Sequence, residues 1–351
     1  MTTAFYAIIA ILFFGLLVSI HELGHFMVAK ACRIRVEEYS VGMGPAIFSC
    51  VKGETKYSLR CIPFGGYCAM TGEDGESDDP RAFVNQAAWK RFLVLAAGSF
   101  MNLVLGFLIM FCLYANAEAF IAPKIESFMK GCPYESEEGL QAGDRFLKID
   151  GHPIYISSDL SDFLDVSDTH DLVLRRDGKK IVLNDFHIKR IEYDGYENKM
   201  YGFNLGYDKG NLVNKIRYSG AMCCEFVRWV FQGLKQLFSD GATMNDLSGP
   251  VGIVDMMAET GASAASTRDA LYDIFYLGAF IAVDIAAMNL LPIPALDGGR
   301  IFTLIISWLI ETITRRKLNP KYETYIHAAG MILLLALMAV IMFNDVFKLF
   351  K

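Results

Sequence analysis

The sequence predicts a polytopic α-helical membrane protein with about four transmembrane helices and one inserted α+β domain. Apolar residues make up 53% and charged residues 21% of the 351 residues, whereas an average soluble domain is about 45–50% apolar and about 25% charged. Long uncharged runs lie toward both ends of the chain, and strand-like alternation fills the segment between them. The net charge of −6 argues against a nucleic-acid-binding protein, which needs a basic surface.

Four apolar runs are long enough to cross a bilayer core of about 30 Å as helices. They lie at about 3–31, 92–117, 271–291 and 324–344. Residues 2–20 carry no charge and no basic residue precedes Lys30, so we expect a retained span rather than a signal peptide. Asp284 lies inside the third run and His327 inside the fourth. The apolar stretch 301–310 is too short to span and is expected to be interfacial or packed between spans.

The distribution of basic residues predicts which connections face the cytoplasm. The connections between spans one and two and between spans three and four are rich in Lys and Arg, whereas the chain ends carry few. Under the positive-inside rule, both basic connections are cytoplasmic. Both termini and the long segment 118–270 are then expected on the extracytoplasmic side.

The segment 118–215 is expected to form the inserted α+β domain. Its stretch 137–154, EEGLQAGDRFLKIDGHPI, resembles the signature of PDZ domains, which bind extended peptides by strand addition. An unrelated small β-rich domain is the alternative. Residues 216–270 are expected to hold an amphipathic helix and a connector. Within them, 222–238 fits either a helix on the membrane surface or an ordinary core helix.

The first span ends in the motif His21-Glu22-Leu-Gly-His25. Residues four apart lie on one face of a helix, so the two imidazoles can bind one Zn²⁺ ion. A carboxylate between them can accept a proton from water during hydrolysis. The alternative is a helix end whose polar residues only face lipid headgroups. Ionisable groups at the end of an apolar span are costly, which favours the metal site.

Asp297 is the best candidate for a third metal ligand. It follows Pro292 and Pro294, which are expected to end the third span, and precedes Gly298 and Gly299, which allow the backbone to turn. The ends of spans one and three are expected on the same side of the membrane, so these residues can meet. The alternative is a Pro/Gly loop that a carboxylate merely caps.

Taken together, HELGH and the stretch NLLPIPALDGG (289–299) resemble the site-2 protease family of intramembrane zinc metalloproteases, with the bacterial regulator of sigma-E protease as the nearest group. The resemblance covers nearly the whole chain. Three further motifs carry it: GYCAMTGED (66–74), GSFMN (98–102) and LSGPVGI (247–253).

The resemblance implies a Zn²⁺ ion on His21, His25 and Asp297, with Glu22 as the catalytic base. It implies that Asn102 and Asn289 hold the substrate or transition state, although Asn102 can also serve as a polar contact between helices. It also implies a membrane-associated β-loop at about 37–75.

The resemblance further implies residence in the bacterial cytoplasmic membrane and cleavage of transmembrane proteins or peptides, such as anti-sigma factors or signal-peptide remnants. The partners are therefore these substrates and the lipid bilayer, with no nucleic acid. The best-known member of the group carries two tandem PDZ domains, whereas 118–215 has room for only one.

Two other functions stay open from the sequence. The first is an inactive membrane scaffold with a peptide-binding domain, against which Glu22 argues because a structural metal site needs no base. The second is a metal transporter that uses the same ligands. Such transporters usually show repeats and several carboxylates within their spans. Apart from Glu22 of the motif and Asp273 at the start of the third span, Asp284 is the only carboxylate in the first three spans.

Overall fold

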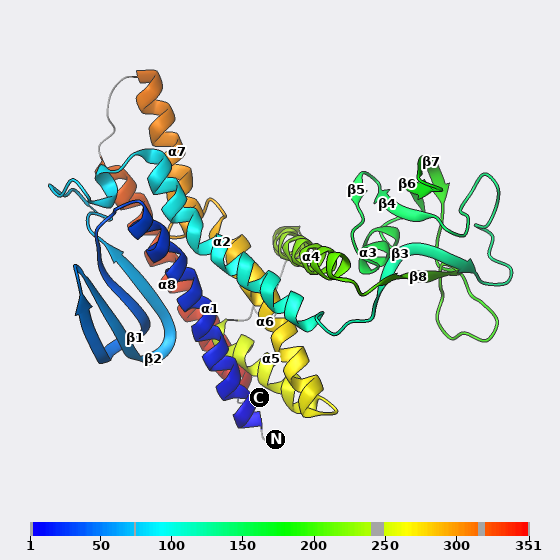
Figure 1. Cartoon of the computed structure of the whole chain (residues 1–351), viewed down its shortest axis with the longest axis horizontal. Helices are drawn as coiled ribbons and strands as arrows, with labels where there is room; N and C mark the ends of the chain where they lie inside the picture. Colours follow the sequence, from blue (N-terminus) through cyan, green and yellow to red (C-terminus); the bar gives the residue numbers. More distant parts are fainter. Residues whose placement is uncertain (1–2, 74, 240–248, 315–319, 350–351) are drawn as a thin grey trace. The chain divides into compact units, whose positions relative to one another are not determined.

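The computed structural model describes the chain except residues 1–2, 74, 240–248, 315–319 and 350–351 (Figure 1). The chain divides into two compact units. The membrane unit comprises Met1–Ile109 and Phe226–Lys351, and the inserted unit comprises Met110–Glu225. Of the sequence motifs above, Asp74, Leu247 and Ser248 lie outside the described residues.

Among the described residues, four helices are long and apolar enough to cross a membrane, which confirms the predicted polytopic architecture. They are α1 (Thr3–Ala31), α2 (Ala88–Leu113), α6 (Thr267–Asn289) and α8 (Pro320–Leu349). The other α-helices of the membrane unit are α5 (Pro250–Ser263), α7 (Asp297–Thr314) and the C-terminal part of α4 (Leu212–Ser239). A short 3-10 helix, η1 (Phe83–Asn85), precedes α2.

The helix α7 is longer than the sequence pattern indicates. It begins at Asp297 and has 18 residues, whereas the apolar pattern marks only 301–310. Its first turn, Asp-Gly-Gly-Arg, has no apolar side chain and contains two glycines, which have low helix propensity. The hydrophobic pattern therefore starts one turn after the helix does.

Among the described residues, two buried clusters hold the membrane unit together. The first joins α1 to α5 and α6 and includes Phe13, Met257 and Ile274. The second joins the end of α1 to the following strand, α2 and α7 and includes Val36, Leu95 and Leu304. The helices also approach closely at Gly24 of α1, where a Cβ would lie 2.4 Å from the Ala97 carbonyl oxygen of α2. These contacts fix the end of α1 against α2 and α7.

A long antiparallel hairpin follows α1 in the membrane unit. Its strands are β1 (Val36–Lys52) and β2 (Thr55–Met70), and the pairing runs from Val36 opposite Met70 to Lys52 opposite Thr55. The hairpin lies beside α1 (Figure 1), where the Tyr39 hydroxyl donates a hydrogen bond to the Ser19 carbonyl at 3.1 Å. The far end of the hairpin exposes apolar side chains, among them Ile47, Phe48 and Val51.

The inserted unit contains a six-stranded sheet with strand order β7-β6-β4-β3-β8, with β5 paired to β4. The strands are β3 (Ala119–Phe128), β4 (Arg145–Ile149), β5 (His152–Pro153), β6 (Thr169–Arg176), β7 (Lys179–His187) and β8 (Phe203–Lys209). One short helix, α3 (Ser158–Leu164), lies between β5 and β6 in the sequence.

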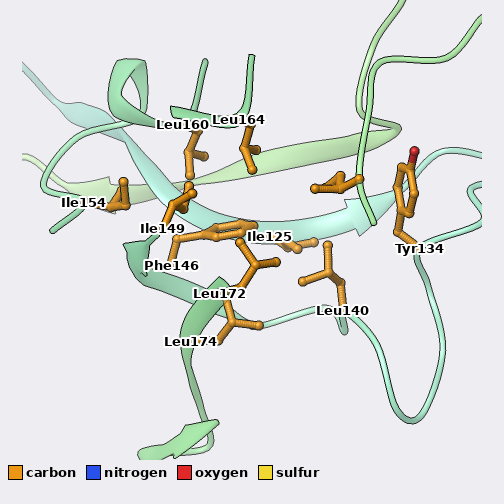
Figure 2. Packing of buried hydrophobic residues seen from close by; sticks show 11 residues of the cluster. Ile125, Tyr134, Leu140, Phe146, Ile149, Ile154, Leu160, Leu164, Leu172 and Leu174 are labelled. Carbon is orange, nitrogen blue, oxygen red and sulfur yellow. The ribbon is translucent and has the colours of Figure 1, made fainter. Parts of the chain in front are cut away.

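The core of the inserted unit forms between the sheet and α3. Figure 2 shows Phe146 and Leu172 of the sheet together with Leu160 and Leu164 of α3, all of them buried. Asp144, in the turn before β4, is fully buried and forms an ion pair with Arg176 of β6 at 2.7 Å. This ion pair ties the turn at Gly143 and Asp144 to the sheet.

Candidate metal centre

The last turns of α1 bring two histidines together. His21 and His25 are one helical turn apart, and their Nε2 atoms lie 3.1 Å from each other. Both residues are buried, with 8% and 7% of their surface exposed. The uninterrupted helix past His25 therefore directs both imidazoles to one point, as the spacing predicts.

Asp297, the first residue of α7, meets the two histidines. Its Oδ2 atom lies 3.1 Å from His21 Nε2 and 3.3 Å from His25 Nε2. The ligand atoms of the three residues all lie within 4.8 Å of one another, the only such group of three or more His, Cys, Asp or Glu residues found in the described part of the chain. The structure thus joins residues that are far apart in the sequence.

Two glycines allow Asp297 to reach this position. A Cβ on Gly298 would lie 2.3 Å from the Leu291 carbonyl oxygen, and one on Gly299 would lie 2.2 Å from that of Ile293. Both glycines lie within α7 and neither has a positive φ. From the sequence we expect Gly298 and Gly299 to allow a turn of the backbone, and this expectation is wrong. They are needed because the preceding loop folds tightly against the first turn of the helix.

The three side chains fit a divalent cation. Asp297 Oδ2 is buried and makes no well-formed hydrogen bond with the described residues, and the two imidazole Nε2 atoms face it at 3.1 and 3.3 Å. A buried carboxylate oxygen without a well-formed hydrogen bond is costly, and a cation held between it and two imidazole nitrogens removes that cost. Two imidazoles and one carboxylate are also a donor set that catalytic zinc sites use, with a fourth position left open.

One face of α2 forms the wall behind the histidines. His25 Nδ1 lies 2.8 Å from the Val94 carbonyl oxygen, which makes this nitrogen the donor and leaves Nε2 with its lone pair toward Asp297. At Gly98 a Cβ would lie 2.4 Å from His25 Nε2 and 2.7 Å from His21 Nε2. Only glycine therefore leaves room for both imidazoles at this point.

A cavity of about 740 Å³ opens onto the cluster. Of the predicted site residues, His21, Glu22, His25, Asn289 and Asp297 line it, so the structure brings these five together. Asn102, the sixth predicted residue, is not among the lining residues. It is fully buried, and its side-chain amide nitrogen lies 3.5 Å from His21 Nδ1.

Residues outside the predicted ligands, base and asparagines also line the site. Tyr67 and Cys68 of β2 line the cavity, and a Cβ on Gly66 would lie 3.5 Å from Glu22 Cγ. Glu73 and Arg300 line the cavity and form an ion pair. From the sequence, Arg300 and the acidic run 73–79 are candidates for lining the mouth of the site, with a solvated loop as the favoured interpretation of the acidic run. The sequence signals that mark this strand are the double glycine at 65–66 and the motif GYCAMTGED (66–74).

The fold and the cluster define a class of protein: helical membrane proteins with a buried candidate metal centre made of two histidines and one carboxylate at the end of a span. The model of peptidase family M50 matches residues 9–337. The chain belongs to this family.

Curated relatives match over almost their full length. A Clostridium perfringens protein named "Putative zinc metalloprotease CPE1693" is 37% identical over 347 residues, covering 97% of this chain and 98% of the relative. The "Regulator of sigma-W protease RasP" of Bacillus subtilis is 26% identical over 431 residues, with 97% and 98% covered. The "Zinc metalloprotease RasP" of Bacillus licheniformis is 26% identical over 444 residues, with the same shares covered.

Proposed function

We propose that this chain is an intramembrane zinc metalloprotease of the site-2 type, which hydrolyses peptide bonds within or near transmembrane segments. One observation carries the proposal: two imidazoles and one carboxylate converge beside a glutamate that lines the same cavity. Membership of peptidase family M50 supports it. The names of its relatives, which include a zinc metalloprotease and a regulator of sigma-W protease, support regulated intramembrane proteolysis.

His21, His25 and Asp297 hold the Zn²⁺ ion in this proposal. When bound, the ion supplies Lewis-acid activation of a water molecule and of the scissile carbonyl group. The hydrogen bond from His25 to the Val94 carbonyl fixes the orientation of one ligand ring. Burial of the two histidines lowers the local polarity and strengthens these electrostatic contacts.

Glu22 is the general base and then the general acid. Its carboxylate takes a proton from the attacking water molecule and returns it to the nitrogen of the leaving amine. Its position on the cavity, directly beside His21 in the sequence, supports this role. The glutamate argues against the two alternative functions, an inactive scaffold and a metal transporter, because neither a structural metal site nor a simple binding site needs a base.

The substrate must be extended before it is cut. A helix satisfies its own backbone hydrogen bonds, so its carbonyl groups are shielded from attack. We propose that an unwound segment lies along β2, whose Tyr67 and Cys68 line the cavity, and that Asn289 donates a hydrogen bond to the substrate backbone. Strand addition of this kind satisfies the backbone of an extended peptide.

The inserted unit is proposed to be a single PDZ-like domain on the extracytoplasmic side. The Gly-Asp turn and the following strand, both part of the PDZ-like signature, support this. The orientation rests on the basic residues of the two connections, which are proposed to be cytoplasmic, with both termini outside. The membrane is proposed to be the bacterial cytoplasmic membrane. Anti-sigma factors and signal-peptide remnants are the proposed substrates.

The test compares the wild-type chain with Glu22→Gln, both purified in detergent. We expect about one zinc ion per chain in both proteins, and cleavage of a fluorescently labelled transmembrane substrate only in the wild type. Zinc in both proteins with no difference in cleavage would favour a scaffold. Uptake of zinc into proteoliposomes, unchanged by Glu22→Gln, would favour a transporter. No zinc in either protein would remove the ligand assignment.

A further inference from the structure

Asn102 occupies a position that neither substrate binding nor simple helix packing explains well. Val94, Gly98 and Asn102 are spaced four residues apart on α2 and therefore lie on one face of it. The first contacts His25 through its carbonyl group, and the second leaves room for both imidazoles. Asn102 is fully buried, and its side-chain nitrogen Nδ2 lies 3.5 Å from His21 Nδ1.

The two histidines have different partners behind them. An imidazole that binds a metal through Nε2 carries its proton on Nδ1, and this proton usually goes to a carbonyl or carboxylate oxygen. His25 has such an acceptor in the Val94 carbonyl oxygen. At His21 Nδ1 the side chain within hydrogen-bonding distance is that of Asn102.

The Asn102 amide has one atom paired and one unpaired. With Nδ2 toward His21, the ring accepts a hydrogen bond at Nδ1 and must carry its proton on Nε2, the atom that faces Asp297. That proton blocks metal binding. The amide oxygen Oδ1 is buried and has no hydrogen-bond partner among the described residues. A half-turn of the amide exchanges two atoms of similar size and brings the oxygen to His21.

We infer that Asn102 is a positioning residue for His21: its Oδ1 accepts the Nδ1–H of His21 and directs the Nε2 lone pair of His21 to the zinc ion. The inference rests on the proposed zinc site and deepens it. The α2 helix then orients both histidine ligands, one through a main-chain carbonyl group and one through a side chain. Asn102 acts through His21 and does not touch the substrate, in keeping with its absence from the cavity lining.

The expected effect is on metal affinity. Removing a hydrogen-bond partner of a ligating histidine typically weakens metal binding by about 10–100-fold. A substrate-binding asparagine would instead change cleavage and leave zinc affinity unaltered. The two roles can therefore be separated without relying on the activity of the enzyme.

The experiment measures Zn²⁺ affinity of the full-length chain in detergent by competition with a chelating dye. Asn102→Leu keeps a similar volume without an acceptor and is expected to bind zinc about 10–100-fold more weakly. Asn102→Asp keeps an acceptor oxygen and is expected to stay within a few-fold of wild type. The matched control is Phe100→Leu on the same helix, whose side chain is 62% exposed and whose zinc affinity should be unchanged.

A second readout is the visible spectrum of the Co²⁺-loaded chain, which reports the geometry of the metal ligands. We expect Asn102→Leu to alter the spectrum. Asn102→Asp should give a spectrum like that of the wild type and should cleave the transmembrane substrate. If Asn102→Leu does not fold, Asn102→Asp still distinguishes orientation of His21 from substrate binding. Normal zinc affinity with lost cleavage in Asn102→Asp would assign the amide nitrogen to the substrate and overturn the inference.

Wild-type zinc affinity in a folded Asn102→Leu chain would overturn the inference alone, because the zinc site would stand without this contact. A wild-type chain that binds no zinc would overturn both the inference and the proposed function. A third outcome separates the two: the wild type binds zinc, Asn102→Leu lowers the zinc affinity, and the wild type cleaves no substrate. This outcome would support the inference and contradict only the protease assignment.

Discussion

Replacing Gly98 by alanine tests the packing of α2 against the histidines. The new Cβ would lie 2.4 Å from His25 Nε2 and 2.7 Å from His21 Nε2, whereas ordinary contacts begin at 3.4 Å. The helix or the rings must therefore move by up to about 1 Å. Zinc–ligand distances vary by only about ±0.2 Å, so a displacement of this size is several times the tolerance of a zinc site.

We expect Gly98→Ala to lower zinc affinity at least about 10-fold and cleavage in proportion, because two ligands are displaced together. Overpacking in the core should also cost about 1–3 kcal/mol of folding stability. The assays are chelator competition, cleavage of the transmembrane substrate and thermal unfolding of the metal-free chain.

The matched control is Gly233→Ala in α4, where a Cβ meets nothing within 4 Å. Alanine there should leave zinc binding unchanged and stabilise the helix by about 0.5–1 kcal/mol. If Gly98→Ala kept wild-type zinc affinity and cleavage, the close approach of α2 to the ligand atoms would be refuted.

Three further predictions concern other parts of the membrane unit. Asp297→Asn should reduce zinc content in elemental analysis to near zero, because the neutral amide is a poor ligand; stoichiometric zinc would contradict this. Breaking the ion pair of Glu73 and Arg300 with Arg300→Gln should lower kcat by loosening the first turn of α7, and the exchange Glu73→Arg with Arg300→Glu should recover part of it. No recovery would indicate that the pair does not act as a unit. Burial raises the pKa of Glu38, but hydrogen bonds from Ser58 and Arg60 outweigh it and bring the pKa to about 2. A lowered pKa stabilises the fold above the unfolded value of about 4.3, and this stability is lost only as the pH falls from there toward 2. Protection of the hairpin from hydrogen exchange, corrected for intrinsic rates, should therefore not change between about pH 8 and about pH 5. A marked loss of protection across that range would be inconsistent with an ion pair between Glu38 and Arg60.

Much of the fold and of the candidate site follows from local patterns in the sequence. Uncharged runs of sufficient length predict the four spanning helices, because a bilayer requires about 20 apolar residues whatever the neighbours are. The spacing of His21 and His25 predicts that they share a helix face, which is a local property of an α-helix. Asp297 can lie beside His21 and His25 if the ends of the first and third spans are on the same side of the membrane.

The remaining features depend on contacts that leave no side-chain pattern. The acceptor for His25 is a main-chain carbonyl, that of Val94, and every residue has one. Gly98, Gly298 and Gly299 are needed because other backbones or rings approach them, so their role becomes visible only in three dimensions. The pairing of Glu73 with Arg300 joins positions 227 residues apart in the sequence, and no local rule relates them.

Asn102 shows where residue type alone misleads. An asparagine in a spanning helix suggests either substrate binding or a polar contact between helices, and the sequence cannot choose between them. Its burial beside His21 Nδ1, away from the cavity lining, points to a third role.

The most direct test of the central claim is X-ray absorption at the zinc edge of the purified chain. We expect one zinc ion with two imidazole nitrogens at about 2.0–2.1 Å and oxygen ligands at about 2.0–2.2 Å. Cys68 is buried and lines the same cavity, so it is the natural rival ligand. A sulfur neighbour at about 2.3 Å, or fewer than two imidazoles around the ion, would contradict the proposed centre of His21, His25 and Asp297.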